Sequence, residues 1–590
     1  MFSPPLKEAV TRRSLVIAVL ALIILAIRAW PAFAQTSPPE PKISISGNFD
    51  QFTSAGRNIY DGNFTRTGDH EWYARTRFRP DFEVAVGRTK AVLGIELDLN
   101  YGQTGSNDGG FPGNNSGAAC GFTGGCKGAG AAGGGLDLNT DVAGLFEVKW
   151  IYTEFDLTGN DSLMPFIPFL TIARAGGQPF GTIANYKIYY ANGDFAGLDL
   201  YTFFVPEIKN HFAYVIVEDQ LAGGNRATPV TATDRGKDYA FIFSPEFTPT
   251  KGLDMKPMFS WFHADGTTAG VARRNAFNLR TAGGALAGGA GGTMNGGIAN
   301  GGQFNGGATV GSQGPVAAGD VTNHEERYTL GLDSRWRVGA FGLDPTISYQ
   351  WGNYDTQAFR NDGSVGRVRG DASAWLFDVI GSYQLGPLLL EARGVYSTGN
   401  KARDNLSLSK RYYEPLDLDT GYWFGWLGIL GLGGVDYFIG GGGSNLGMST
   451  NIGYDRYGRG GFALRTTYSI MPTLSVYGVV APTWTAEKVD TQGTGCPPLT
   501  VATSAVGCVS RIAQTGSGRP AFAAGDSSYL GTEVNGGFTW RFAPNASFDL
   551  AGYYLFAGSA LDQAETLNGV NVKREARDGY YAAARVRLSF

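Results

Sequence analysis

Charged and apolar residues alternate in the segment 71–83, and this spacing points to chemistry with ions. Its even positions are mostly apolar, whereas its odd positions hold Glu71, Tyr73, Arg75, Arg77, Arg79, Asp81 and Glu83. Successive side chains of a β-strand point to opposite faces, so these polar groups would share one face. Rows of guanidinium and carboxylate groups attract or repel ions by charge, so we expect this face to contact charged solutes.

The same alternation recurs in segments further along the chain. In 323–338, Arg327 and Asp333 occupy the positions opposite Tyr328 and Leu332. A charge that faces lipid costs about 2–4 kcal/mol near the membrane midplane, so these charges should face an aqueous interior. We predict that the following residues line this interior and set its selectivity: Arg75, Arg77, Arg79, Glu96, Asp98, Arg327, Asp333, Arg335, Arg337, Arg393, Arg465, Arg541, Arg585 and Arg587. The alternative for each arginine is a salt bridge to a neighbouring strand that only stabilises the wall.

The histidines and nucleophiles of the chain do not form a catalytic pattern. His70, His211, His263 and His324 lie far apart in the sequence, and none accompanies a nearby acid or nucleophile in a motif. The region of Ser527 resembles a hydrolase serine motif, but no histidine follows it. We therefore expect no enzymatic activity, no cofactor and no metal site.

The four cysteines form two pairs, each in a glycine- or proline-rich stretch. In an oxidising compartment, the simplest interpretation of their spacing is two local disulfides, Cys120–Cys126 and Cys496–Cys508. A metal site is the alternative, although neither spacing matches that of a zinc ligand pair.

The first 34 residues have the pattern of a secretory leader. Three basic residues precede the fourteen uncharged residues 14–27, and Ala32 and Ala34 fit a signal peptidase site. The uncharged run is shorter than the roughly 20 residues that span a bilayer, which disfavours the alternative of an uncleaved anchor. We predict a signal peptide over 1–34 and a short periplasmic segment over 35–41.

After this leader, the chain is acidic and rich in glycine and aromatic residues. The leader holds four of the 48 basic and one of the 52 acidic residues, so the remaining net charge is near −7. This charge argues against nucleic acid as a partner. No apolar stretch reaches the length of about eighteen residues that a membrane helix needs. A secreted chain of this type can enter lipid only as a closed β-barrel, because every backbone polar group must be bonded internally.

Eighteen alternating segments predict the wall of such a barrel. They are 42–53, 70–86, 88–102, 143–158, 164–176, 196–206, 209–219, 237–248, 251–265, 323–338, 340–354, 371–385, 387–399, 459–471, 473–486, 527–543, 545–558 and 578–590. Eight short connectors alternate with nine long ones, which places both ends of the chain on the side of the short turns.

The fold class that follows is all-β. We predict a transmembrane antiparallel up-and-down β-barrel over 42–590, with about eighteen strands and with sixteen or twenty as alternatives. Short turns would face the periplasm and long loops the outside of the cell. The longest of these loops are glycine-rich and span 103–142, 266–322, 400–458 and 487–526.

Two of these loops have the bulk to enter the bore. The loop 266–322 is rich in glycine pairs and has almost no charge in its second half, so it either folds inward or stays disordered outside, and disorder is slightly favoured. The loop 400–458 contains the apolar and aromatic run 422–439, which is too costly to leave in water. That run either packs inward as a plug or adds a hairpin that raises the strand count to twenty.

The chain ends on an aromatic residue in an alternating strand. In 580–590, the even positions are apolar and the odd positions carry most of the polar groups. This ending resembles the closing strand of Gram-negative outer-membrane barrels, whose terminal aromatic residue is part of an assembly signal. The resemblance implies that Phe590 and its strand are recognised by the barrel assembly machinery.

Three segments resemble the alginate-export class of eighteen-stranded outer-membrane channels. They are 71–80 (EWYARTRFRP), 94–103 (GIELDLNYGQ) and 555–561 (LFAGSAL). Members with known roles export an anionic polysaccharide through a bore densely lined with arginine, and Arg75, Arg77 and Arg79 match that lining. Carboxylates such as Glu96 share the inward faces here, which departs from the family pattern.

We therefore expect an outer-membrane channel of a Gram-negative bacterium for the passive diffusion of small hydrophilic solutes. The alternative is an export channel for an anionic polysaccharide such as alginate. The partners would be outer-membrane lipid, the barrel assembly machinery, and small polar solutes or the polysaccharide. The sequence leaves open the solute, the direction of transport and the oligomeric state.

Overall fold

The computed structural model of the chain describes residues 39–58, 64–65, 70–101, 146–181, 183–187, 189–191, 193–205, 207–218, 238–266, 323–359, 365–401, 409–416, 426–430, 457–489, 491, 525–567 and 570–590. Several predicted features lie outside these residues. They are the signal peptide 1–34, both cysteine pairs, and the loops 103–142 and 266–322 apart from Gly266.

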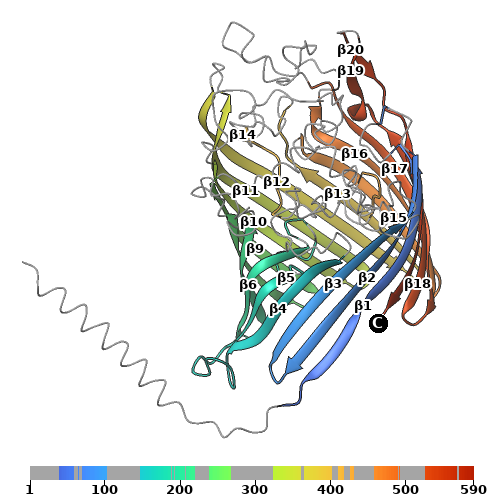
Figure 1. Cartoon of the computed structure of the whole chain (residues 1–590). Helices are drawn as coiled ribbons and strands as arrows, with labels where there is room; N and C mark the ends of the chain where they lie inside the picture. Colours follow the sequence, from blue (N-terminus) through green and yellow to red (C-terminus); the bar gives the residue numbers. More distant parts are fainter. Residues whose placement is uncertain are drawn as a thin grey trace, which may run out of the picture.

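In the described residues, eighteen antiparallel strands form one closed wall (Figure 1). They are β1 (Lys42–Arg57), β2 (His70–Val86), β3 (Thr89–Tyr101), β4 (Phe146–Thr158), β5 (Leu170–Pro179), β6 (Asp194–Val205), β7 (Ile208–Glu218), β8 (Asp238–Thr250), β9 (Leu253–Gly266), β10 (Asn323–Val338), β11 (Phe341–Phe359), β12 (Val365–Leu385), β13 (Leu388–Ser397), β15 (Arg459–Met471), β16 (Leu474–Val489), β17 (Ser527–Ala543), β18 (Ala546–Ala557) and β21 (Gly579–Ser589). The predicted fold class and strand number are confirmed.

The wall closes where the last strand meets the first. Strand β21 pairs with β18 on one side and with β1 on the other, over the register from Asn48↔Ser589 to Arg57↔Tyr580. The final residue extends this seam, because Gly47 and Phe590 exchange backbone hydrogen bonds of 2.9 and 3.0 Å. Closure leaves the wall without an unpaired sheet edge, as lipid requires.

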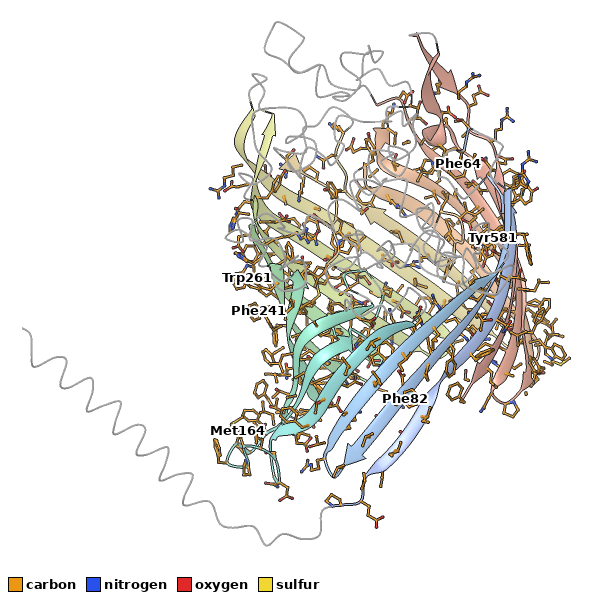
Figure 2. All side chains as sticks on the ribbon, in the orientation of Figure 1. Phe64, Phe82, Met164, Phe241, Trp261 and Tyr581 are labelled. Carbon is orange, nitrogen blue, oxygen red and sulfur yellow. The ribbon has the colours of Figure 1, made fainter. Side chains whose placement is uncertain are left out.

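The alternation of the sequence separates the two faces of the wall. Large apolar side chains such as Phe241, Leu330 and Phe377 are exposed on the outer face, and Figure 2 shows Phe241 and Trp261 projecting outward. Polar side chains such as Arg327 and Asp378 are buried on the inner face. A wall that is apolar outside and polar inside fits a membrane-spanning barrel.

Short turns join the strands at one end of the barrel, where both β1 begins and β21 ends (Figure 1). Gly339 and Gly386 have φ angles of 57° and 54°, which glycine adopts without steric penalty in such tight turns. The strand ends that the long connectors join lie at the opposite end, together with the small hairpin of β19 (Gln563–Leu567) and β20 (Val570–Arg574) and the 3-10 turn η8 (Ser559–Leu561). The predicted arrangement of connectors is therefore confirmed.

The strand boundaries differ most from the sequence prediction in two regions. Strand β5 begins at Leu170 rather than at residue 164, because Pro165 and Pro168 have no N–H to donate to a ladder. The connector predicted over 355–370 is mostly strand, since the β11–β12 pairing continues to Phe359↔Val365.

A β-bulge interrupts the pairing of β3 with β4. The β3–β4 register shifts between Gly94↔Trp150 and Ile95↔Val148, so Lys149 is the extra residue of the bulge. Lys149 then forms an ion pair of 2.9 Å with the buried Asp194. The bulge thus allows Lys149 to point inward while Ile151 remains on the outer face.

Within the described residues, no helix has both the length and the hydropathy needed to cross a membrane.

Candidate functional site

The inner wall carries buried arginine–carboxylate pairs, and Arg393 with Asp378 is one of them. Arg393 on β13 donates from Nε and Nη2 to the two carboxylate oxygens of Asp378 on β12, at 3.0 and 2.5 Å. Both side chains are 2% exposed. A bidentate pair removed from water neutralises both charges, so it stabilises the wall and places no net charge in the bore.

The predicted selectivity row on β2 is paired in the same way. Glu96 on β3 lies 3.0 Å from Arg77 and also accepts a hydrogen bond from Arg79. Arg77 is buried, whereas 29% of the Arg79 side chain is exposed. Comparable cross-strand pairs are Arg174–Glu154, Arg465–Glu391, Arg585–Asp549 and Arg587–Asp50. The arrangement considered as an alternative, a salt bridge within the wall, thus occurs at these arginines.

Two predicted arginines lie towards the end of the barrel that carries the short turns. The guanidinium of Arg335 lies 4.4 Å from the ring centroid of Tyr186. Arg337 is about half exposed and pairs with Asp344 across the β10–β11 hairpin. These side chains belong to the mouth of the barrel rather than to its centre.

Three other residues predicted to line the bore, Arg541, Asp98 and Arg75, do not form a described ion pair of this kind. Arg541 is exposed next to a short turn, where its backbone N–H donates to the carbonyl oxygen of Thr473 at 2.7 Å. Asp98 pairs with Arg77 in the β2–β3 register, and Arg75 pairs with Asn100. The side chains of Arg75 and Asp98 lie outside the part of the chain that the structure describes.

The connector between β5 and β6 folds into the barrel, and we call its described residues 183–187 and 189–191 the first inward segment. Asp333 on β10 holds it, because one carboxylate oxygen accepts the backbone N–H groups of Tyr186 and Lys187 at 2.8 and 2.7 Å. The other oxygen accepts from the Thr346 hydroxyl at 2.7 Å. Asp333 was predicted to line the bore, and it lies on the inner face but is fully buried beneath this segment.

Lys187 and Tyr190 attach the same segment to other strands. The Lys187 ammonium donates to the carbonyl oxygens of Asp344 and Asp378 at 2.7 and 2.9 Å. Burial lowers the pKa of Lys187, and the carboxylates of Asp378 and Asp333 oppose this shift. The Tyr190 hydroxyl donates to Ser260 on β9 at 2.6 Å. The first inward segment is therefore fixed by polar contacts on several sides.

A second inward segment, residues 409–416, comes from the connector between β13 and β15. Glu414 lies 2.6 Å from Arg327 on β10, and Arg327 also pairs with Glu325 at 3.1 Å. Lys410 completes this network through contacts of 3.4 and 3.5 Å with Glu325 and Glu414. All four side chains are at most 5% exposed, so two positive and two negative charges neutralise one another inside the barrel.

A third inward segment, residues 426–430, belongs to the same connector. The carboxylate of Glu533 on β17 accepts the backbone N–H groups of Gly428, Ile429 and Leu430 at 2.6, 3.0 and 2.9 Å. Asn535 donates to the carbonyl oxygen of Trp426 at 2.7 Å. Of the two outcomes predicted for the loop 400–458, inward packing is the one that its described residues adopt.

Sequence reasoning missed the first inward segment. It treated 177–195 only as a long connector between two strands. Tyr189 and Tyr190 of this connector are 0% exposed inside the barrel. A useful signal was the group of five isoleucine and tyrosine residues within 183–190, which a water-exposed loop of a channel would not favour.

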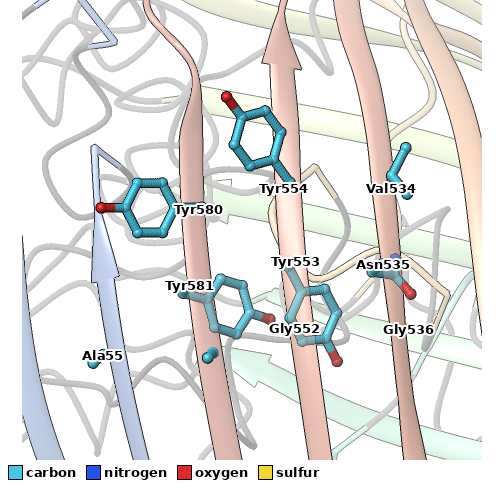
Figure 3. Close-up of a pocket in the computed structure, with 10 residues that line it drawn as sticks. Ala55, Val534, Asn535, Gly536, Gly552, Tyr553, Tyr554, Tyr580 and Tyr581 are labelled. Carbon is cyan, nitrogen blue, oxygen red and sulfur yellow. The ribbon is translucent and has the colours of Figure 1, made fainter.

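A groove of about 480 Å³ lies in the wall itself (Figure 3). Gly536 and Gly552 pair in register at its centre, and the absence of side chains thins the wall there. Outward residues such as Tyr554 and Tyr580 alternate with inward Tyr553 and Tyr581 along it. We assign no solute to this groove because it does not lie along the bore.

Comparison with solved structures found similar chains, whereas the two sequence comparisons found none. No family model and no curated protein matches the chain. Pseudomonas aeruginosa OccK8 (OprE) and a BenF-like porin from Pseudomonas fluorescens Pf-5 are each similar at 9% identity and a TM-score of 0.42, over 93% of this chain and 98% of theirs. Pseudomonas aeruginosa OccK5 (OpdH) is similar at 8% identity and a TM-score of 0.40, with the same coverage.

Proposed function

We propose that the chain is a channel in the outer membrane of a Gram-negative bacterium, through which small hydrophilic solutes diffuse passively. The observation that carries this proposal is the closed wall of eighteen strands with an apolar outer face and a charged, polar inner face. Side chains of the wall fill the interior of a barrel of about eight strands, whereas a barrel of this size encloses further space.

The inward segments support a preference for small solutes. The first and second segments are both anchored to strand β10, through Asp333 and Arg327 respectively. They therefore occupy the same side of the bore and narrow it there. Ion pairs and hydrogen bonds join both inward segments to the wall, so the constriction is a fixed part of the barrel structure.

The pairing of charges favours diffusion over export of an anionic polysaccharide. Export of a polyanion through an arginine-lined bore requires positive charge that the wall itself does not neutralise. The arginines at 77, 79, 393, 465, 585 and 587 all lie beside carboxylates of adjacent strands. Closely opposed charges of both signs create a local field across the bore, which sorts solutes by charge and dipole.

We propose the partly exposed members of these pairs as the selectivity residues. They are Arg79, Arg465 and Arg587, whose side chains are 29, 29 and 30% exposed. We propose Arg75 and Asp98 as selectivity residues as well, because they occupy positions in the same β2–β3 register. Catalysis is not part of the proposed role, and recognition of Phe590 by the assembly machinery remains a prediction.

Recordings of the refolded, purified chain in planar bilayers test this function. We expect stable single-channel steps, and liposomes that contain the protein should admit small neutral sugars at rates that fall with sugar size. Protein-free liposomes serve as the control. A folded barrel that neither conducts nor admits the smallest sugar would contradict the proposal.

A further inference from the structure

Two histidines and a glutamate meet on the outer face of the wall, near the end that carries the long connectors. His263 lies near the end of β9, and His324 and Glu326 lie at the start of β10. The antiparallel register pairs His263 directly with Glu326, and His324 is two residues from Glu326 on the same face of its strand. Residues distant in sequence thus become neighbours.

The donor atoms of these three side chains are close to one another. His263 Nδ1 lies 2.7 Å from Glu326 Oε1, and His324 Nε2 lies 3.7 Å from the same oxygen. Each residue offers one ligand atom, and these three atoms all lie within 4.8 Å of one another. Nitrogen and oxygen ligands of a tetrahedral zinc ion, bound at about 2.0–2.2 Å, lie somewhat more than 3 Å apart. Small side-chain movements would therefore complete a coordination site.

The cluster is on the outside of the barrel. Glu326 shares its face of β10 with Tyr328 and with Leu330, which is 54% exposed, whereas Glu325 and Arg327 point inward and are buried. Figure 2 shows Trp261, the neighbour of His263 on the same face of β9, on the outer wall. The site is thus separate from the proposed solute pathway.

The Glu326 carboxylate on the outer face needs partners that neutralise its charge. An ionised group on the outer wall is unfavourable close to lipid, unless partners neutralise it. Trp261 donates its indole N–H to the second oxygen of Glu326, which fixes the orientation of the carboxylate. The ring of Tyr239 stacks on His263 with centroids 4.8 Å apart. Both contacts hold the ligand side chains in place, as residues around a metal site do.

We propose that His263, His324 and Glu326 bind a divalent transition-metal ion of the zinc type. Two imidazoles and one carboxylate form a three-ligand set, which leaves a further coordination position for water or an external ligand. Binding of the metal at His263 Nδ1 would replace the hydrogen bond to Glu326, and the neutral ring would then carry its proton on Nε2. Mg²⁺ and Ca²⁺ prefer oxygen ligands, so the two nitrogens disfavour these ions. This proposal departs from the expectation of no metal site stated in the sequence analysis.

Zinc titration of the purified chain in detergent micelles tests the proposal. The four cysteines are first alkylated, so that thiolates do not contribute. We expect one Zn²⁺ to bind per chain, and His263→Ala and His324→Ala should each weaken binding at least about tenfold. Substitution of Co²⁺ should give the visible absorption of a nitrogen- and oxygen-ligated ion, and this signal should be lost in both variants.

Matched variants separate this site from other histidines and from loss of folding. His70→Ala should bind zinc like the unmodified chain, because His70 is exposed on β2, away from the cluster. Trp261→Phe keeps the aromatic ring but removes the indole N–H, and should weaken binding about 10-fold through the orientation of Glu326. Heat-dependent migration in detergent gels reports whether each variant remains a barrel.

Two results would overturn the proposal. One is the absence of stoichiometric Zn²⁺ binding to the folded, alkylated chain. The other is equal Zn²⁺ affinity in the double variant H263A/H324A and the unmodified chain. Binding of Mg²⁺ as tight as that of Zn²⁺ would also count against a nitrogen-ligated site.

Discussion

The backbone N–H of Leu416 donates to the carbonyl oxygen of Tyr190 at 2.8 Å, inside the barrel. This bond joins the first inward segment, which enters after β5, to the second, which enters after β13. Only Ser409 and Lys410 of the second segment pair with the wall, as the short strand β14 parallel to β12. For the rest of both segments, contacts of this type determine where each one lies. A change in the anchor of one segment should therefore affect the position of the other.

Asp333→Asn should loosen the first inward segment. The carboxylate of Asp333 accepts three hydrogen bonds through two oxygens, whereas the amide of asparagine has one oxygen. At least one of the three donors therefore loses its acceptor, which costs about 1–3 kcal/mol of local stability. We expect larger or noisier single-channel conductance with an intact barrel. Asp344→Asn is the control, because its carboxylate pairs with Arg337 near the exposed mouth. Identical recordings from D333N and the unmodified chain would show that the segment does not limit flow.

The pairing of Arg77 and Arg79 with Glu96 predicts a change in ion selectivity. Replacing both arginines with serine leaves the Glu96 carboxylate without its two cationic neighbours, so the bore should become more permeable to cations. Reversal potentials in a salt gradient measure this shift. Adding Glu96→Gln to the double variant should reverse most of it. An unchanged reversal potential in R77S/R79S would remove these arginines from the selectivity proposal.

The sequence was sufficient to predict the wall because its signal is local. Alternation with a period of two identifies a strand from its own residues, and the turn glycines at 339 and 386 mark where strands end. The outer face of a membrane barrel also tolerates few charges, which fixes the register of segments such as β10. The strand count and the connector pattern follow from these rules.

The interior could not be predicted in the same way. Asp333 looks identical in sequence to a residue that lines a water-filled bore, and only the fold brings Tyr186 and Lys187 above it. The carboxylate of Glu533 likewise meets residues about a hundred positions away. The pair of His263 and Glu326 depends on a hairpin whose connector contains more than fifty residues. Contacts of this type leave no periodic trace in the sequence.

Glu533→Gln should release the third inward segment. The carboxylate accepts three backbone N–H groups, and a neutral amide with one oxygen cannot accept all of them in this geometry. The local loss should be about 1–3 kcal/mol, without loss of the barrel. Limited proteolysis of intact liposomes, followed by mass spectrometry, should reveal new cleavage within 409–430. Glu246→Gln, on β8, is the control, and equal protease resistance in both variants would contradict this role of Glu533.

The position of Leu330 provides a test of the membrane orientation on which the proposed function depends. It lies halfway along β10 on the outer face, with 54% of its surface exposed. Leu330→Arg should destabilise the folded barrel in lipid vesicles by about 2–4 kcal/mol, because it places a cation near the bilayer midplane. Val338→Arg, at the end of the same strand, should cost only about 0–1 kcal/mol, since an arginine there reaches the interface. Urea unfolding in vesicles measures both values. Equal effects at the two positions would show that the outer face does not contact the hydrocarbon core, because the depth of the residue would then be irrelevant.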